Sequence, residues 1–189
     1  MDKRINTVTA TLGRRNSGKT YLTLQLIDAY MKNRADMKIL VVDTLDHPHY
    51  NLVANIEIDM LKHWKKHSIY RIYGYDMKMI MAAIEENLAN TLIIFEDASK
   101  YVDKLMDKHI KRIIFDSKQK NNDIIFLFHG FMSTPPELFR LLDLLTIFKT
   151  GDHPKTRKND MVNYEEVLAA YNEIMKSKNE HIHKSIKIY

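Results

Sequence analysis

The feature that most constrains this chain is a glycine-rich segment between a predicted strand and a predicted helix. The segment runs from Gly13 to Thr20 with the sequence Gly-Arg-Arg-Asn-Ser-Gly-Lys-Thr. Residues 5–12 before it are rich in β-branched side chains in partial alternation, which predicts a strand. Residues 21–30 after it space their apolar side chains as a helix does. A strand, this loop and a helix in that order are the context of a phosphate-binding P-loop.

The P-loop predicts a site for a nucleoside triphosphate, which we take to be ATP. Backbone N–H groups of the loop and of the helix N-terminus favour the β-phosphate. We expect Lys19 to reach the β- and γ-phosphate oxygens and the Thr20 hydroxyl to hold Mg²⁺. The candidate cofactor-binding residues are Gly13, Arg14, Arg15, Asn16, Ser17, Gly18, Lys19 and Thr20.

Short apolar segments alternate with amphipathic ones along the rest of the chain. Further strands are expected at residues 37–43, 69–73, 91–95, 123–128 and 144–148, and helices at 77–90, 103–120 and 135–145. This alternation predicts an α/β fold, a mostly parallel sheet with helices on both faces. We expect residues 1–150 to form the P-loop core, followed over 151–189 by a polar loop, a helix at 164–175 and a tail.

Acidic residues follow two of the predicted buried strands, at the sheet edge where such folds bind ligands. Asp43 ends the strand at 37–43. Glu96 and Asp97 follow the strand at 91–95 in a Walker B pattern whose acids are reversed from the usual order. By position, Glu96 would organise Mg²⁺ and Asp97 would orient the attacking water. Alternatively Asp97 is the metal residue, and Ala98 then leaves the base position empty. The first assignment is favoured.

Other candidate catalytic residues lie beyond the acid pair. His129 ends the strand at 123–128, where it either senses the γ-phosphate or is a buried histidine satisfied by neighbouring backbone. Arg112, Arg140 and Arg15 are candidates for the cation that stabilises the transition state. Arg112 and Arg140 lie on predicted helices, from which either could reach a neighbouring subunit's nucleotide.

The charge and composition narrow the class of partner. The formal charge is +5, and between Lys100 and Lys120 there are seven Lys or Arg residues against three Asp. A second basic cluster spans residues 62–67 and contains Trp64, which could stack on a base. Either cluster is a DNA-contacting surface or a solvated face. The chain has no cysteine, no apolar stretch long enough for a membrane span and no room for a signal peptide before its first strand, so a cytoplasmic location is expected.

With both nucleotide motifs in place, the chain resembles the FtsK–HerA superfamily of P-loop ATPases, especially viral genome-packaging ATPases and zonula occludens toxin-like phage assembly ATPases. The resemblance rests on residues 13–20, 92–98 and 123–131, and extends to the element at 135–140. It implies ATP hydrolysis coupled to DNA translocation by a pentameric or hexameric ring, with packaging of a viral genome and a capsid or portal component as partner. A protein of this kind would work in the host cytoplasm or on the virion. The reversed acids and a histidine in place of the usual sensor amide depart from the family pattern.

Two other functions remain open from the residues. A small-molecule kinase also uses a P-loop, but it places the strands at 5–12 and 91–95 side by side, whereas a pumping ATPase inserts the strand at 123–128 between them. A nucleotide-gated scaffold with little turnover is the third hypothesis, and the reversed acid pair is the observation that favours it.

Overall fold

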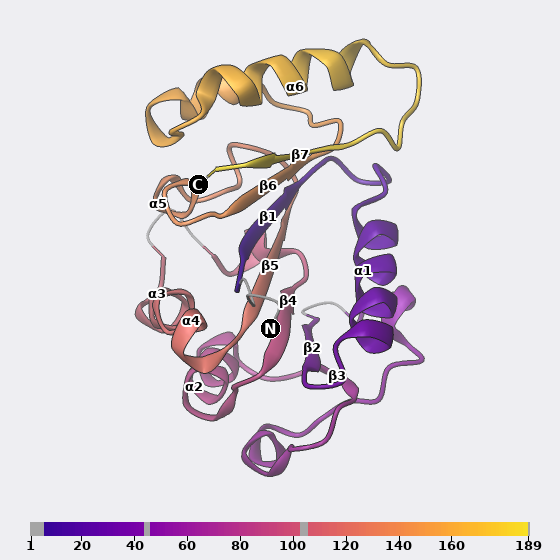
Figure 1. The fold of residues 1–189 in the computed structure, drawn as a ribbon, viewed down its shortest axis with the longest axis vertical. Helices are drawn as coiled ribbons and strands as arrows, with labels where there is room; N and C mark the ends of the chain where they lie inside the picture. The colour runs from indigo at the N-terminus through magenta and orange to yellow at the C-terminus, as the bar shows by residue number, and fades with distance from the viewer. Residues whose placement is uncertain (1–5, 44–45, 103–105, 189) are drawn as a thin grey trace.

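The structure is a computed structural model that describes residues 6–43, 46–102 and 106–188. It contains a seven-stranded sheet in the order β3-β2-β4-β5-β1-β6-β7 (Figure 1). The strands are β1 (Val8–Leu12), β2 (Lys38–Val42), β3 (Ile69–Ile72), β4 (Thr91–Phe95), β5 (Asp123–Phe128), β6 (Leu144–Ile147) and β7 (Lys184–Lys187). Neighbouring strands are parallel except for β6 and β7, which are antiparallel.

The described helices fall into longer α-helices and short turns of helix. The α-helices are α1 (Lys19–Asn33), α2 (Met77–Asn87), α3 (Lys108–Phe115), α4 (Ser117–Lys120), α5 (Pro136–Phe139) and α6 (Tyr164–Lys176). The 3-10 helices are η1 (Pro48–Tyr50), η2 (Ile58–His63), η3 (Ala98–Lys100) and η4 (Pro154–Asp160). None of the helices in the described ranges is long and apolar enough to cross a bilayer.

The sheet buries both of its faces, as the apolar composition of its strands requires. Along β4 the side chains alternate, so that Leu92 and Ile94 pack toward α1 while Ile93 and Phe95 join the core on the other face. That second core also receives apolar side chains of α2, α3, α5 and α6. The predicted α/β fold, with a mostly parallel sheet and helices on both faces, is confirmed.

The position of β5 decides between two predicted strand orders. Strand β5 pairs with β1 on one side and with β4 on the other, so the P-loop strand and the acid-pair strand are not neighbours. This is the order expected for a pumping ATPase. A kinase would have β1 and β4 side by side, which is not observed. The central strands β2, β4, β5 and β1 are parallel, so all of them end at the same edge of the sheet.

The predicted helices at 103–120 and 135–145 are shorter in the structure. Helix α3 begins only at Lys108, after Asp107, whose side chain accepts a hydrogen bond from His109 N. Residues 103–105 of the predicted helix lie outside the described part of the chain. Helix α5 ends at Phe139 because the chain must turn into the sheet, where Asp143 accepts a hydrogen bond from Val8 N at 2.8 Å. The overlap predicted between helix and strand near residue 144 is resolved in favour of β6.

The C-terminal segment returns to the sheet. Residues 154–160 of the predicted polar loop form η4. The bounds of α6, Tyr164–Lys176, nearly match those of the helix predicted at 164–175. In the tail, β7 pairs with β6 and buries Ile186 and Ile188 in the larger core. The division of the chain near residue 150 stays a prediction.

Replacing Phe126 by alanine should strongly destabilise the fold. Phe126 is fully buried in the central strand β5, with its ring stacked on Phe95 at a centroid distance of 4.8 Å. We expect the free energy of unfolding in denaturant to fall by about 3–5 kcal/mol. Phe115→Ala is the matched control, because that side chain is 62% exposed and its loss should change stability by no more than about 0.5 kcal/mol. Equal losses in the two variants would contradict this packing.

Candidate functional site

The P-loop joins β1 to α1 and contains two glycines, Gly13 and Gly18. A side chain at Gly13 would clash with its neighbours, and the backbone conformation of Gly18 disfavours any other residue. A Cβ on Gly13 would lie 2.5 Å from Ser17 Oγ and 2.8 Å from Phe148 Cβ. Gly18 adopts φ 104°, in the left-handed region that L side chains rarely occupy. Helix α1 begins at the next residue, so its N-terminal N–H groups open into the loop.

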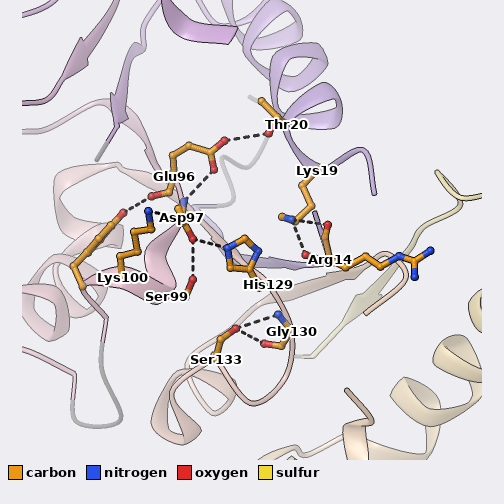
Figure 2. A network of polar contacts seen from close by, with 12 residues as sticks. Arg14, Lys19, Thr20, Glu96, Asp97, Ser99, Lys100, His129, Gly130 and Ser133 are labelled. Carbon is orange, nitrogen blue, oxygen red and sulfur yellow. Dashed lines mark hydrogen bonds and ion pairs between the residues drawn. The ribbon is translucent and has the colours of Figure 1, made fainter. Parts of the chain in front are cut away.

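Lys19 and Thr20 point from the start of α1 toward the sheet edge (Figure 2). Lys19 Nζ donates hydrogen bonds to the carbonyl oxygens of Gly13 at 2.6 Å and Arg14 at 3.1 Å. Thr20 Oγ1 donates to Glu96 Oε1 at 3.1 Å. Burial lowers the pKa of Lys19 below its ordinary value, although the Glu96 and Asp97 carboxylates act in the opposite direction.

Of the two adjacent acids, Glu96 is the one whose side chain contacts the P-loop, through Thr20. Besides Thr20, its Oε1 accepts a hydrogen bond from the buried Tyr50 hydroxyl at 3.4 Å, and its Oε2 accepts one from Asp97 N at 3.0 Å. The Tyr101 hydroxyl donates to the Glu96 backbone oxygen at 3.1 Å. Burial, with the nearby Glu96 charge, raises the pKa of both tyrosines, so each remains a hydrogen-bond donor near neutral pH. These contacts fix the carboxylate in place.

Asp97 faces His129 instead of the P-loop (Figure 2). Asp97 adopts φ 46°, and this left-handed conformation turns its side chain away from that of Glu96. Its carboxylate lies 3.0 Å from His129 Nε2, accepts a hydrogen bond from Ser99 Oγ at 2.8 Å and lies 3.3 Å from Lys100 Nζ. Burial alone would raise the pKa of Asp97, but the Ser99 hydrogen bond and the charges of His129 and Lys100 hold it below the ordinary value.

A cavity of about 540 Å³ connects these groups at the carboxyl edge of the sheet. This volume lies within the range of small-molecule sites. It is lined by the P-loop from Arg15 to Tyr21, by Asp43, Glu96, Asp97 and His129, and by His47, His49 and His181. Asp43 accepts a hydrogen bond from His47 N at 2.8 Å, which ties it to the loop that forms this wall.

The three candidate arginines are placed differently. Arg15 lines the cavity. Arg112 forms an ion pair with Glu85 at 3.1 Å and Arg140 lies 3.7 Å from Asp160, and neither lines this cavity. Of these three arginines, Arg15 alone lines the cavity, whereas Arg112 and Arg140 are largely exposed.

Trp64 does not offer a stacking surface, which corrects the prediction made for the basic cluster at 62–67. The indole is buried in the core, and its Nε1 donates to Ser68 Oγ at 2.8 Å and to the Lys66 backbone oxygen at 3.0 Å. An apolar ring with a single N–H donor gains more from burial here than from exposure. The lysines at 62, 65 and 66 are exposed around it. In the second basic stretch, Lys100, Lys111 and Arg112 form ion pairs within the chain.

Sequence reasoning missed the residues that hold the loop after His129. Asp152 accepts hydrogen bonds from Phe131 N at 3.1 Å and Met132 N at 2.6 Å. Arg157 donates to the carbonyl oxygens of the same two residues at 3.1 and 3.0 Å. Both side chains come from the C-terminal segment, where the sequence shows only a polar loop with no pattern that indicates these contacts.

The residues present fit a magnesium ion together with a triphosphate. Mg²⁺ prefers hard oxygen ligands and commonly takes one or two from protein, with phosphate and water supplying the others. The Thr20 hydroxyl and the Glu96 carboxylate already meet at 3.1 Å, beside the ammonium of Lys19. No cluster of three or more His, Cys, Asp or Glu residues suited to a metal occurs in the described ranges.

Comparison with known proteins finds the same fold in viral enzymes. Genome packaging NTPase B204 from Sulfolobus turreted icosahedral virus 2, solved with ATP-gammaS, is 14% identical over 97% of this chain and 92% of that chain, with a TM-score of 0.76. B204 from Sulfolobus Turreted Icosahedral Virus, a DNA-packaging ATPase, is 12% identical over 99% of this chain and 100% of that chain, with a TM-score of 0.66.

A weaker likeness is to the N-terminal domain of zonular occludens toxin from Neisseria meningitidis. It is 12% identical over 78% of each chain, and its TM-score of 0.42 is too low to support an inference. No protein-family model matches the chain, and no curated protein matches it in sequence. The predicted resemblance to viral genome-packaging ATPases is confirmed at the level of the fold.

Replacing Gly130 by alanine should disturb the loop that follows His129. A Cβ there would lie 2.4 Å from Asp152 Oδ1, so the carboxylate would have to leave the N–H groups of Phe131 and Met132. We expect the free energy of unfolding to fall by about 1–3 kcal/mol, measured by denaturant titration. Gly151→Ala is the control, because a Cβ at Gly151 meets nothing within 4 Å. The interpretation fails if both alanine variants are as stable as the parent.

Proposed function

We propose that this protein is an ATPase that couples ATP hydrolysis to the movement of DNA, most specifically to the packaging of a viral genome. One observation carries the nucleotide part of the proposal: Thr20, at the end of a complete P-loop, donates a hydrogen bond to Glu96 across strand β5. A P-loop hydroxyl and a strand-end carboxylate held together in this way are the protein half of a Mg²⁺-nucleotide site.

The P-loop binds the triphosphate in this proposal. Backbone N–H groups from residues 13–20 surround the β-phosphate, and the cation of Lys19 shifts from the Gly13 and Arg14 carbonyls to the β- and γ-phosphate oxygens. Burial lowers the pKa of Lys19, while the Glu96 and Asp97 carboxylates act against that shift and favour the charged ammonium. Thr20 and Glu96 would hold Mg²⁺, and the ion would supply positive charge to the phosphate oxygens.

In this proposal Asp97 and His129 position and activate the attacking water. The water oxygen forms a bond to the γ-phosphorus, the bond from that phosphorus to the β,γ-bridging oxygen breaks, and ADP and phosphate leave. Asp97 orients the water and accepts its proton, and His129, 3.0 Å from Asp97, stabilises the carboxylate and detects the loss of the γ-phosphate. The division of roles, Glu96 for the metal and Asp97 for the water, is supported by the Thr20–Glu96 contact and by the apolar, buried Ala98 at the next position.

A cation at the γ-phosphate completes the catalytic group. Arg15 supplies it from within the chain, since it lines the cavity. Arg112 and Arg140 lie away from this chain's cavity, so either one acts only on the nucleotide of a neighbouring subunit in a ring. A pentameric or hexameric homo-oligomer is therefore part of the proposal.

DNA is the proposed partner on the basis of fold and charge. The solved structures that share this fold include a viral DNA-packaging ATPase and a genome packaging NTPase. The chain carries a net charge of +5, and the lysines at 62, 65 and 66 form an exposed basic group on the edge of the sheet. Contact with phosphates through such lysines is independent of sequence and weakens with salt. A capsid or portal component would anchor the ring, and host cytoplasm or virion is the expected location.

A nucleotide-gated scaffold with little turnover is the second candidate. The observation that favours it is the reversed order of the acids, because the side chain of Asp97 points to His129, Ser99 and Lys100 and not to the Thr20 hydroxyl. A scaffold would bind ATP as tightly as a motor but would not release phosphate faster when DNA is added.

The ATPase rate with and without double-stranded DNA tests the proposal. DNA should stimulate phosphate release by the parent protein. Lys19→Ala should abolish ATP binding, and Asp97→Asn should lower the rate by about 10²–10⁴-fold while ATP still binds, because the proton acceptor is lost. Glu96→Gln should lower the rate by at least about 10²-fold through weaker Mg²⁺ binding.

The control for these variants is Glu166→Gln, an exposed position on α6 that lies outside the cavity. It should retain the parent rate. ATP binding without measurable turnover in the parent, with or without DNA, would overturn the motor in favour of the scaffold. Turnover that DNA does not change would leave an ATPase but remove the DNA part.

A further inference from the structure

A segment near the C-terminus lies directly against the P-loop. Between α6 and β7, Glu180 forms an ion pair with Arg14 and also accepts a hydrogen bond from Lys149 Nζ at 2.8 Å. His181 follows, and its Nδ1 lies 3.3 Å from the Ser17 backbone oxygen. Figure 1 shows this end of the chain returning beside the turn between β1 and α1. We call residues 180–183 the strap.

The strap is held from two sides. The His183 ring stacks on that of Phe148, with a centroid distance of 4.7 Å. Hydrogen bonds from Lys149 and Arg14, with the charges of both side chains, lower the pKa of Glu180, so the carboxylate stays ionised near neutral pH. Phe148 and Lys149 directly follow β6, the strand beside β1, so the strap is fixed to the same sheet that positions the P-loop.

The P-loop itself is shaped to accept the strap. A Cβ built on Gly18 would lie 3.3 Å from His181 Nδ1 and 3.3 Å from Phe148 Cε1. The absence of a side chain at Gly18 therefore lets the imidazole approach the loop backbone. His181 lines the same cavity as Lys19, Glu96 and Asp97, although it is 162 residues from Lys19 in the sequence.

The order of the strands shows which end of a nucleotide the strap would meet. Glu96 and Asp97 follow β4 and His129 follows β5, and both strands lie on one side of β1. Phe148 follows β6 and the strap precedes β7, and these two strands lie on the other side of β1. The γ-phosphate and Mg²⁺ must lie toward the acids. The opposite end of the molecule, the ribose and base, then extends toward β6 and the strap.

Two aromatic side chains that line the cavity are candidates for contact with the base. His181 is one, and Tyr21, the third residue of α1, is the other. Tyr21 is 67% exposed, so its ring is accessible to a ligand in the cavity. A planar base gains binding energy from stacking on such rings and can hydrogen-bond to the imidazole.

We propose that the strap completes the nucleotide site, with His181 and Tyr21 contacting the base and ribose of the nucleoside triphosphate. This rests on the proposed function, because it takes the P-loop to hold the triphosphate. Glu180 is a positioning residue: its ion pairs with Arg14 and Lys149 keep His181 over the loop. The C-terminal segment thereby contributes to affinity for the nucleoside without touching the phosphates.

The test compares two ligands that differ only in the nucleoside. Affinities for Mg·ATP and for Mg·tripolyphosphate are measured by calorimetry on the full chain and its variants. His181→Ala and Tyr21→Ala should each weaken ATP binding by about tenfold, since loss of one stacking ring removes about 1.4 kcal/mol of binding free energy. Tripolyphosphate affinity should change less than about twofold. Tyr21→Phe should restore ATP binding, because the ring remains.

Glu180→Gln should reproduce the His181→Ala pattern more weakly. The matched control is His63→Ala, the same substitution at an exposed position outside the cavity, which should leave both affinities unchanged. Circular dichroism melting confirms that each variant is folded.

Three results would overturn the proposal. Equal loss of ATP and tripolyphosphate affinity would mean that the strap only supports the P-loop, and no loss of either would mean that it is not part of the site. If the parent binds tripolyphosphate as tightly as ATP, no nucleoside subsite exists. A parent that binds neither ligand refutes the proposed function itself, which is a separate failure.

Discussion

The hydroxyl of Thr20 meets the carboxylate of Glu96 across strand β5, and the rest of the candidate site depends on this contact. It joins the start of α1 to the end of β4, two elements that no sheet pairing connects directly. The contact is made because parallel strands end at one edge, and because Tyr50 and Asp97 N hold the carboxylate in the required direction. Once Glu96 is fixed, the left-handed turn at Asp97 aims the second acid at His129. Two adjacent carboxylates thus take separate partners.

The C-terminal segment supports this edge from both sides of β1. On the β5 side, Asp152 and Arg157 bind the backbone of the loop that follows His129. On the β6 side, Glu180 and His181 contact the P-loop. Residues after 150 therefore touch both loops that a triphosphate would lie between.

Much of this site could be predicted because its residues are marked by local sequence. The P-loop has a spacing that backbone geometry demands, and Glu96 and Asp97 follow an unbroken apolar strand. The insertion of the strand at 123–128 between the P-loop strand and the acid-pair strand, which the resemblance to pumping ATPases implies, is observed. Contacts made by residues far apart in the sequence could not be predicted. Tyr50 and Tyr101 look like ordinary loop tyrosines until the fold brings their hydroxyls to Glu96.

Other predictions were wrong because tertiary contacts outweighed a local pattern. Trp64 lies in a basic cluster, but the core offers its ring an apolar site and its N–H an acceptor. The apolar spacing at 135–145 resembles a helix, yet the chain must enter the sheet at Leu144. His181 had no signal in sequence, since its pairing with Ser17 depends on the antiparallel return of β7.

The most direct measurement is a double-mutant cycle on the Mg²⁺ dependence of ATP binding. Affinities of the parent, Thr20→Val, Glu96→Gln and the double variant are measured with and without Mg²⁺. If the two groups hold one ion, Mg²⁺ strengthens ATP binding to the parent, each single change removes most of that gain, and the double change removes little more. Additive losses, or ATP affinity that Mg²⁺ does not alter in the parent, would contradict the assignment of Thr20 and Glu96 to a common metal.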